Sequence, residues 1–372
     1  MTPRSSVTPP RWTALGLFGP VVIALACSHT DPFANPGTGE QPFDPGPPAR
    51  LTVSPGQDRS PSWLADGSAV LYSAQQLNRV DLDVCLAELP PTGGQQRRLV
   101  CDIPGNGTST DAAQSPAASA DGRIALLSAG NGNIGGTSPV FLDLVVLPTL
   151  DAPNPQRVRA LPFTPSGGTP QDYAGHLRWL TVDALVYVGQ RFLTKQDCES
   201  CPRDTVLVGT EVTTLTADGA TATTVPGTVL ATGVAPILDG SAILYTLPND
   251  TRVYRRSLAR GDVVVAHDFA AAGIVRDVHA AGNRVVAVVG GRVAFSVDPG
   301  LGPVQWDSGG VLHVFSLDGT DSQPLDTPGR LYRRPALSPD GSRILAEGYP
   351  LIIGDNDTTV SRSSDLYLFG GE

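Results

Sequence analysis

The feature that most constrains this chain is a repeat in which a strand-like run is broken by Asp-Gly. An apolar run such as SAVLYSA or SAILYTL follows the pair, and two degenerate copies, HLRWLTVDALVYVG and VRDVHAAGNRVVAVVG, extend the series to six copies. Asp-Gly favours a tight hairpin turn, so each copy is expected to be a small antiparallel meander. One meander cannot bury both of its faces, and the repeat therefore predicts a solenoid, an array or a propeller. The four pairs are Asp66-Gly67, Asp121-Gly122, Asp239-Gly240 and Asp340-Gly341.

The two ends of the repeat region indicate that the array closes into a ring. The first copy contains four strand-like runs, SPSW, SAVLYSA, VDLDVCLAEL and QQRRLVCDI, named A to D. The last copy has only three, ending at SDLYLFGGE, while a spare strand at Ala49–Pro55 precedes the first copy. Pairing this spare strand with the last copy would leave no open edge. The sequence predicts an all-β, six-bladed β-propeller of four-stranded antiparallel blades over residues 49–372.

The run ARLTVSPGQDRSPSWLADGSAVLYSA, and LSPDGSRILAEG near the other end, resemble the WD40-like repeat of TolB-type β-propellers. The resemblance spans the region of the repeats and implies six blades. The third and fifth copies depart from the pattern, with Asp183-Ala184 and Gly282-Asn283 in place of Asp-Gly. TolB itself carries a separate α/β domain before its propeller and has no lipid anchor, so the resemblance concerns the propeller alone.

The first residues predict export. Arg4 and Arg11 precede the apolar run WTALGLFGPVVIALA, which is too short to span a membrane and is typical of a signal peptide over residues 1–26. Small residues before Cys27 resemble a lipoprotein cleavage site, with Cys27 as the lipid attachment; the alternative is a plain secretory signal. Residues 27–48 are rich in Pro and Gly and are expected to form a tether. Ser28 resembles the outer-membrane sorting class, which predicts an outer-membrane lipoprotein held to the membrane by its lipid only.

Charge and motif content exclude several functions. The formal net charge is −10, and removal of the signal peptide would make it two charges more negative, so a nucleic-acid partner is not expected. Asp307-Ser308-Gly309-Gly310 echoes a protease loop, but no GxSxG motif accompanies it. No metal cluster or cofactor motif stands out, and neither a metal nor a cofactor is expected.

Antiparallel order places the A–B and C–D turns on one face of the ring and the long B–C loops on the other. The innermost strands begin on this second face, around the central channel. Several Arg gathered there would bind carboxylates of an envelope protein, a peptide or an acidic glycan. The alternative is that they pair with nearby Asp and only line a wet channel. The candidate ligand-binding residues are Arg59, His176, Arg178, Arg276, Asp277, Arg333 and Arg334, beside Asp58.

Two cysteine pairs are candidate disulfides. Cys85 and Cys101 are equidistant from Gly93, the centre of the first C–D turn, so they are expected to face each other across an antiparallel pair. Cys198 and Cys201 form a CxxC that is interpreted as a small disulfide pinning a long loop, with redox or metal roles as alternatives.

Together these features favour a monomeric binding or scaffolding module of the bacterial envelope. The alternative function is a lyase or hydrolase of acidic polysaccharide built on a TolB-like propeller. Such enzymes resemble this chain in fold but hold their metal with several His, and of the five His here only His176 is expected at the channel mouth.

Overall fold

The computed structural model describes fourteen segments of the chain, all within one compact unit, Asp31–Glu372. No helix in these segments is long and apolar enough to cross a membrane. The described residues are 48–53, 57–75, 84–101, 110–131, 140–150, 156–161, 170–195, 204–290, 293–298, 302–307, 309–325, 330–353, 358–360 and 364–370. Cys27, Cys198 and Cys201 lie outside them.

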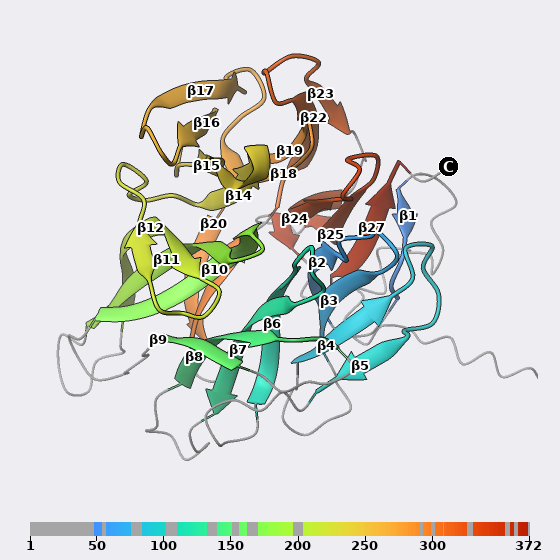
Figure 1. The fold of residues 1–372 in the computed structure, drawn as a ribbon. Helices are drawn as coiled ribbons and strands as arrows, with labels where there is room; N and C mark the ends of the chain where they lie inside the picture. The colour runs from blue at the N-terminus through green and yellow to red at the C-terminus, as the bar shows by residue number, and fades with distance from the viewer. Residues whose placement is uncertain are drawn as a thin grey trace, which may run out of the picture. The chain divides into compact units, whose positions relative to one another are not determined.

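The described strands form six antiparallel blades, as the repeat predicts (Figure 1). Blade 1 contains β2 (Asp58–Trp63), β3 (Val70–Gln75), β4 (Val84–Leu89) and β5 (Arg98–Val100). Blade 2 contains β6 (Thr110–Ala118), β7 (Ile124–Asn131), β8 (Val140–Leu147) and β9 (Gln156–Leu161). Blade 3 contains β10 (Pro170–Thr181), β11 (Ala184–Lys195), β12 (Asp204–Thr216) and β13 (Ala222–Thr224).

The second half of the chain repeats this order with insertions. Blade 4 contains β14 (Gly233–Ile237), the 3-10 turn η1 (Leu238–Gly240), β15 (Ala242–Thr246), β16 (Arg252–Ser257) and β17 (Val263–Asp268). Blade 5 contains β18 (Val275–Ala281), β19 (Arg284–Val289), β22 (Val311–Ser316) and β23 (Gln323–Leu325), with the hairpin of β20 (Val293–Asp298) and β21 (Gly302–Asp307) inserted between its second and third strands. Blade 6 contains β24 (Arg330–Leu337), β25 (Ile344–Ile353), β27 (Asp365–Phe369) and β1 (Ala49–Arg50), and β26 (Thr358–Val360) pairs with β25.

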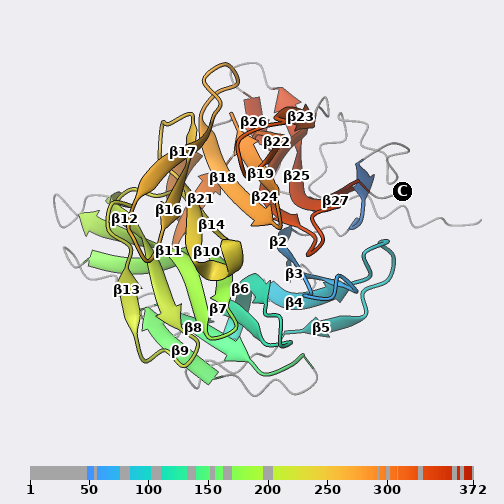
Figure 2. The same ribbon diagram turned by 45° about the horizontal axis from the view of Figure 1, so that its top comes forward.

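The inner strands form a ring around a common centre. Each inner strand contacts the inner strand of the next blade in the order β2, β6, β10, β14, β18, β24, and β24 contacts β2 again (Figure 2). The second strand of a blade is buried on both faces, as the five buried residues of β15 show. Blades on either side cover it, which is why these runs are apolar without alternation.

The hydrophobic core lies between the blades. Among the described residues, buried apolar side chains form six clusters, each shared by two neighbouring blades. Tryptophans add a contact at two of these boundaries. Trp63 donates through Nε1 to the carbonyl of Ala336 at 3.0 Å, and the guanidinium of Arg343 lies over its ring. Trp179 repeats this bond to Ala117 of blade 2 at 2.8 Å. In blades 1 and 3 a Trp therefore joins the blade to the one before it in the ring.

The ring is closed by the chain's own ends, which confirms the predicted closure. Ala49 pairs with Leu368 and Arg50 with Tyr367, so that the first strand becomes the outer strand of the last blade (Figure 1). The ladder continues for one bond past β1, where the amide of Leu51 donates to Leu366 at 2.7 Å. An ion pair between Arg50 and Asp365, largely shielded from solvent, adds to the seam.

Aspartates shape the tight turns on the A–B face. The carboxylates of Asp66, Asp121 and Asp340 each accept a hydrogen bond from the amide two residues later. These bonds form Asx turns, and the following glycine adopts positive φ in all three turns. Hydrogen bonds from Ser338 and Ser342 lower the pKa of Asp340 to about 2. Blade 4 differs, because its Asp-Gly lies in η1 with Leu238 and Asp239 both at positive φ.

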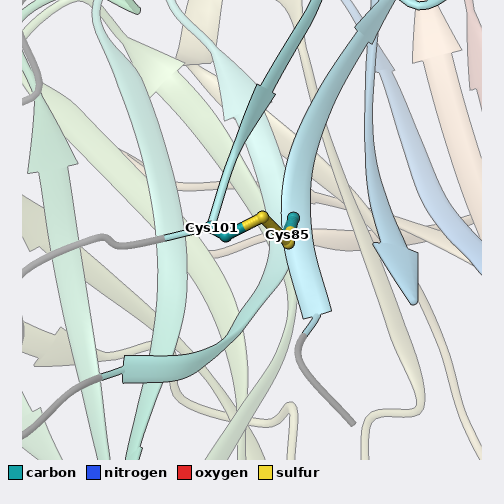
Figure 3. Close-up of a disulfide and its surroundings, with 2 residues drawn as sticks. All are labelled: Cys85 and Cys101. Atoms are coloured by element: carbon teal, nitrogen blue, oxygen red, sulfur yellow. A yellow bond between two sulfur atoms is a disulfide. The ribbon is translucent and has the colours of Figure 1, made fainter. Parts of the chain in front are cut away.

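The pairing of β4 with β5 has the register that the cysteines predict. Leu86 pairs with Val100 and Glu88 with Arg98, so Cys85 and Cys101 are the next facing pair. The structure joins the two cysteines by a disulfide, with a Cα–Cα separation of 4.3 Å (Figure 3). The formation of this bond in the cell stays a prediction.

Closure generates the first testable prediction. Deleting residues 1–53 removes β1 and exposes the edge of β27, which then offers unpaired backbone groups to another chain. We expect the truncated protein to melt at a lower temperature than a control beginning at Ala49, and to associate. Thermal unfolding and size-exclusion chromatography measure both effects. Equal melting temperatures and a monomeric truncated protein would show that the seam contributes nothing.

Candidate binding site at the channel mouth

The inner strands of four blades share one irregularity beside the channel. Their pairing is interrupted for two residues, and the first of these two has a positive φ although it is not glycine. Such a bulge re-aims side chains, and a non-glycine residue in this conformation costs about 1–3 kcal/mol. The strained residues are Ser60 (52°), Ser115 (50°), His176 (53°) and Arg334 (48°). Four blades therefore carry a strained residue at the same position of the inner strand. His176 and Arg334 belong to the candidate site, and Ser60 is hydrogen-bonded to Arg334.

His176 and Asp277 form a pair across blade 4. Nδ1 of His176 lies 3.1 Å from Oδ1 of Asp277, whose side chain is 1% exposed. The amide of Val278 donates to the same oxygen at 2.7 Å. Burial acts to raise the pKa of Asp277, but the imidazole of His176 and the guanidinium of Arg178 outweigh it and lower this pKa. Asp277 is therefore a carboxylate that fixes the orientation of the imidazole ring.

The contact between blades 3 and 5 depends on a glycine in blade 4. Gly233 begins β14, and a Cβ at this position would lie 3.0 Å from Oδ1 of Asp277 and 3.0 Å from Oγ1 of Thr246. Real Cβ atoms rarely come so close to another atom, so a larger residue would push the Asp277 carboxylate aside. The absence of a side chain at Gly233 therefore leaves the room that the carboxylate of Asp277 needs to reach His176.

Arg178 lies beside this pair and is half-buried. Its Nη1 donates to the carbonyl of Leu177 at 2.9 Å. Burial lowers its pKa, the carboxylate of Asp277 opposes this effect, and the positive charge of Arg334 adds to it. Within the described segments, Nε of Arg178 and Oδ2 of Asp277 are buried without hydrogen-bond partners. Two unsatisfied polar atoms at one place raise the cost of this arrangement.

Arg333 and Arg334 have different surroundings although they are adjacent. Nη2 of Arg333 lies 3.0 Å from Oε1 of Glu347, and the two side chains are 6% and 0% exposed. The Arg334 side chain is 33% exposed, donates to Oγ of Ser60 at 2.6 Å and lies 3.9 Å from Oε2 of Glu347. Arg333 thus belongs to a buried ion pair. Of these two candidate binding residues, Arg333 is therefore buried in blade 6, whereas the side chain of Arg334 is partly open to solvent.

His279 is a channel residue that the sequence reasoning missed. Its Nδ1 accepts a hydrogen bond from the amide of Leu337 at 3.2 Å, and burial, followed by the charge of Arg178, lowers its pKa to about 3. A usable signal was present, because residues two apart in a strand share a face and His279 follows Asp277 at that spacing. Ser60 and Glu347 were missed as well, because Ser60 is uncharged and the arginine that pairs with Glu347 lies on another strand.

The remaining predicted residues flank this group. Arg276 donates through Nε to the carbonyl of Gly290 at 3.2 Å, and Asp58 is fully buried at the start of β2. Arg59 lies beside Asp58 and is partly exposed. The positive charge of Arg334 contributes to lowering the pKa of Arg178, so these two predicted arginines lie within electrostatic range of each other.

Comparisons with known proteins support the fold of this chain and nothing more specific. No family model matches the sequence, and no curated protein matches it. Regucalcin, a calcium-binding protein from Agrobacterium tumefaciens, is similar in structure with a TM-score of 0.51, 14% identity, and coverage of 88% of this chain and 94% of that chain. A gluconolactonase from Xanthomonas campestris has a TM-score of 0.49 and 13% identity, covering 88% and 96%. TolB from Acinetobacter baumannii has a TM-score of 0.45 and 14% identity, covering 77% and 58%.

The two adjacent arginines generate a prediction about stability. Arg333→Gln leaves Glu347 buried without its closest cation, which typically costs about 3–5 kcal/mol of the free energy of unfolding. Arg334→Gln removes a partly exposed side chain and is expected to cost about 1 kcal/mol or less. Denaturant unfolding of the two variants measures the difference. Similar losses in both would contradict the assignment of Arg333 to the fold and of Arg334 to the site.

Proposed function

We propose that this chain is an exported, membrane-tethered binding module whose channel mouth captures carboxylate groups of an acidic envelope partner. Cys27 after a short apolar run, followed by a Pro- and Gly-rich segment, supports the tether. The propeller supports the binding role, because it places residues from several blades around one channel.

The observation that carries the proposal is the juxtaposition of Arg178 and Arg334. The guanidinium groups of Arg178 in blade 3 and Arg334 in blade 6 act on each other as like charges. Of the carboxylates near them, Asp277 is paired with His176, and Glu347 lies closer to Arg333 than to Arg334. An incoming carboxylate would relieve this repulsion and accept charge-assisted hydrogen bonds from both groups.

The negative net charge of the protein restricts where an acidic partner can bind. With a net charge of −10, the protein repels anions at long range, so an acidic partner binds only where local contacts overcome that repulsion. Exposed charges are screened over about 10 Å at 0.1 M salt. Salt screens both the long-range repulsion and the local attraction of Arg178 and Arg334 for a carboxylate. We expect the local attraction to dominate, so that the affinity for an acidic partner falls as salt is added.

A fluorescent hexaglutamate peptide provides the test. We expect Arg178→Gln combined with Arg334→Gln to weaken its binding at least tenfold in fluorescence anisotropy. Arg260→Gln is the matched control, because this arginine is 81% exposed and lies between β16 and β17, away from the channel residues. Equal binding by the double variant and the control would move the site elsewhere. Depolymerisation of an acidic polysaccharide by the protein would instead favour the lyase or hydrolase alternative.

The anchor has its own prediction. Cys27→Ser removes the proposed lipid attachment, and the apolar run before it is too short to hold the protein in a membrane. We expect the variant to leave the membrane fraction and appear as soluble exported protein, which fractionation and immunoblotting detect. Unchanged membrane association would contradict the lipoprotein proposal. It would not bear on the proposed binding site at the channel mouth.

A further inference from the structure

The outer strand of blade 4 has an edge that no described strand covers. β17 ends the sheet order β14, β15, β16, β17 and lies on the outer rim of the ring (Figure 1). Three successive residues of this strand, Val263, Val264 and Val265, are 42%, 45% and 48% exposed. No other three successive large apolar residues of the described segments are exposed in this way. An exposed apolar edge is a place where a second extended chain can pair with a sheet.

The ladder between β16 and β17 shows which backbone groups are free. The amide of Ser257 donates to the carbonyl of Asp262 at 3.1 Å, and the register then runs unbroken through Val265. Hydrogen-bonded and non-hydrogen-bonded pairs alternate in an antiparallel ladder, so Val264 turns its backbone groups toward β16. The N–H and C=O groups of Val263 and Val265 therefore face the open edge, where they can bond to an added strand.

A bulge limits the open stretch. The register of β16 with β17 shifts between Val253 and Tyr254, which leaves Ala266 as the extra residue of β17. The next residue, His267, donates through Nδ1 to the carbonyl of Gly319 in blade 5 at 3.0 Å. Blade 5 thus lies against β17 beyond the bulge, and the three valines are the part left open. Because so short a backbone contact scarcely offsets the cost of ordering a second chain, side chains must add to the affinity.

Two arginines beside the valines set the charge of the partner. In the pairing of β16 with β17, Arg255 stands opposite Val264 and Arg256 stands opposite Val263. Neither arginine forms an ion pair in the described part of the chain. Directly opposed residues share a face of the sheet, so the two arginines lie on opposite faces. An added strand would run about 10 Å from β16, within reach of an arginine and a glutamate side chain together.

The carboxylates of the same hairpin are already engaged. Oδ1 of Asp250 lies 2.9 Å from Nε of Arg252, and Oδ1 of Asp262 lies 3.5 Å from Nε of Arg260. Asp268 accepts hydrogen bonds from one side chain and from one backbone amide. The cations beside the open edge are therefore left for a carboxylate that comes from outside the hairpin.

The same arginines disfavour a second copy of this chain as the partner. Two open edges would pair with Val263 opposite Val265 and with the two Val264 residues facing each other, because only outward-facing groups can bond. The two Arg255 residues would then share one face, about 14 Å apart, with only valines between them. Like charges so placed oppose the pairing, whereas a carboxylate on the added strand attracts both arginines.

We infer that the open edge of β17 binds an extended acidic segment of another protein as an added β-strand. Its backbone bonds to Val263 and Val265, its apolar side chains lie against the valines, and its carboxylates lie beside Arg255 and Arg256. This site is separate from the channel mouth and does not rest on the proposed function.

The fluorescent peptide TVEEVT is the probe, and TVQQVT is its uncharged match. Thr and Val favour an extended chain, and two adjacent Glu side chains point to opposite faces of a sheet. We expect TVEEVT to bind the full mature chain at least tenfold more tightly than TVQQVT in fluorescence anisotropy. In hydrogen exchange, bound TVEEVT should slow the amides of Val263 and Val265 at least tenfold. The amide of Val264, already bonded to β16, should not change.

Two substitutions at one position separate the backbone contact from the side chain. Val265→Pro removes an N–H that faces the open edge, where proline is tolerated, whereas Val265→Ala keeps this N–H. We expect the proline variant to bind TVEEVT at least fivefold more weakly than the alanine variant. Arg255→Gln combined with Arg256→Gln should abolish the preference for TVEEVT over TVQQVT. Arg178→Gln combined with Arg334→Gln should preserve it.

Equal binding by the proline and alanine variants, or equal binding of the two peptides to the parent, would overturn the inference. A parent dimer that Val265→Pro dissociates would overturn it too, because a second copy would then occupy the edge. If Val265→Pro does not fold, hydrogen exchange in the parent decides alone. Hexaglutamate binding that ignores Arg178 and Arg334 would remove the proposed function, while TVEEVT would still bind at β17.

Discussion

The pairing of β1 with β27 is the contact on which the rest of the structure depends. Without it blade 6 loses its outer strand, and nothing in the chain's connectivity keeps blade 6 beside blade 1. The bond from Arg334 to Ser60 and the bond from Trp63 to Ala336 both cross this boundary. Ring closure therefore stabilises the last blade and also sets the distance across the channel at which the polar groups meet.

The channel combines strain, burial and charge in a way that ordinary blade packing does not require. Four inner strands carry a non-glycine residue at positive φ, and Gly233 leaves the space in which Asp277 meets His176. These features lower the stability of the fold. Packing alone would favour apolar side chains at these positions, so the buried polar groups indicate a role other than stability. The apolar clusters between the blades supply the stability that offsets the cost of these polar groups.

Much of the fold was predictable because the repeat expresses it locally. The Asp-Gly turns, the apolar second strands and the displaced strand at Ala49 each need only a few neighbouring residues to be recognised. The register of Cys85 with Cys101 followed from the position of one turn. The site was less predictable, since Arg333 and Arg334 are neighbours in sequence and differ only in what surrounds them. Glu347, which separates their roles, lies on the next strand.

The sequence by itself determined the number of blades, their strand order, the closure of the ring and the set of strands that bring polar residues to the channel. It did so because turns and strand patterning are short-range properties. The tertiary structure alone decided that Asp277 crosses blade 4 to hold His176, that Arg333 is buried with Glu347, and that His279 of blade 5 accepts a hydrogen bond from Leu337 of blade 6. These contacts join residues of different blades or strands, and their distances depend on how the blades are spaced around the ring, which no local pattern records.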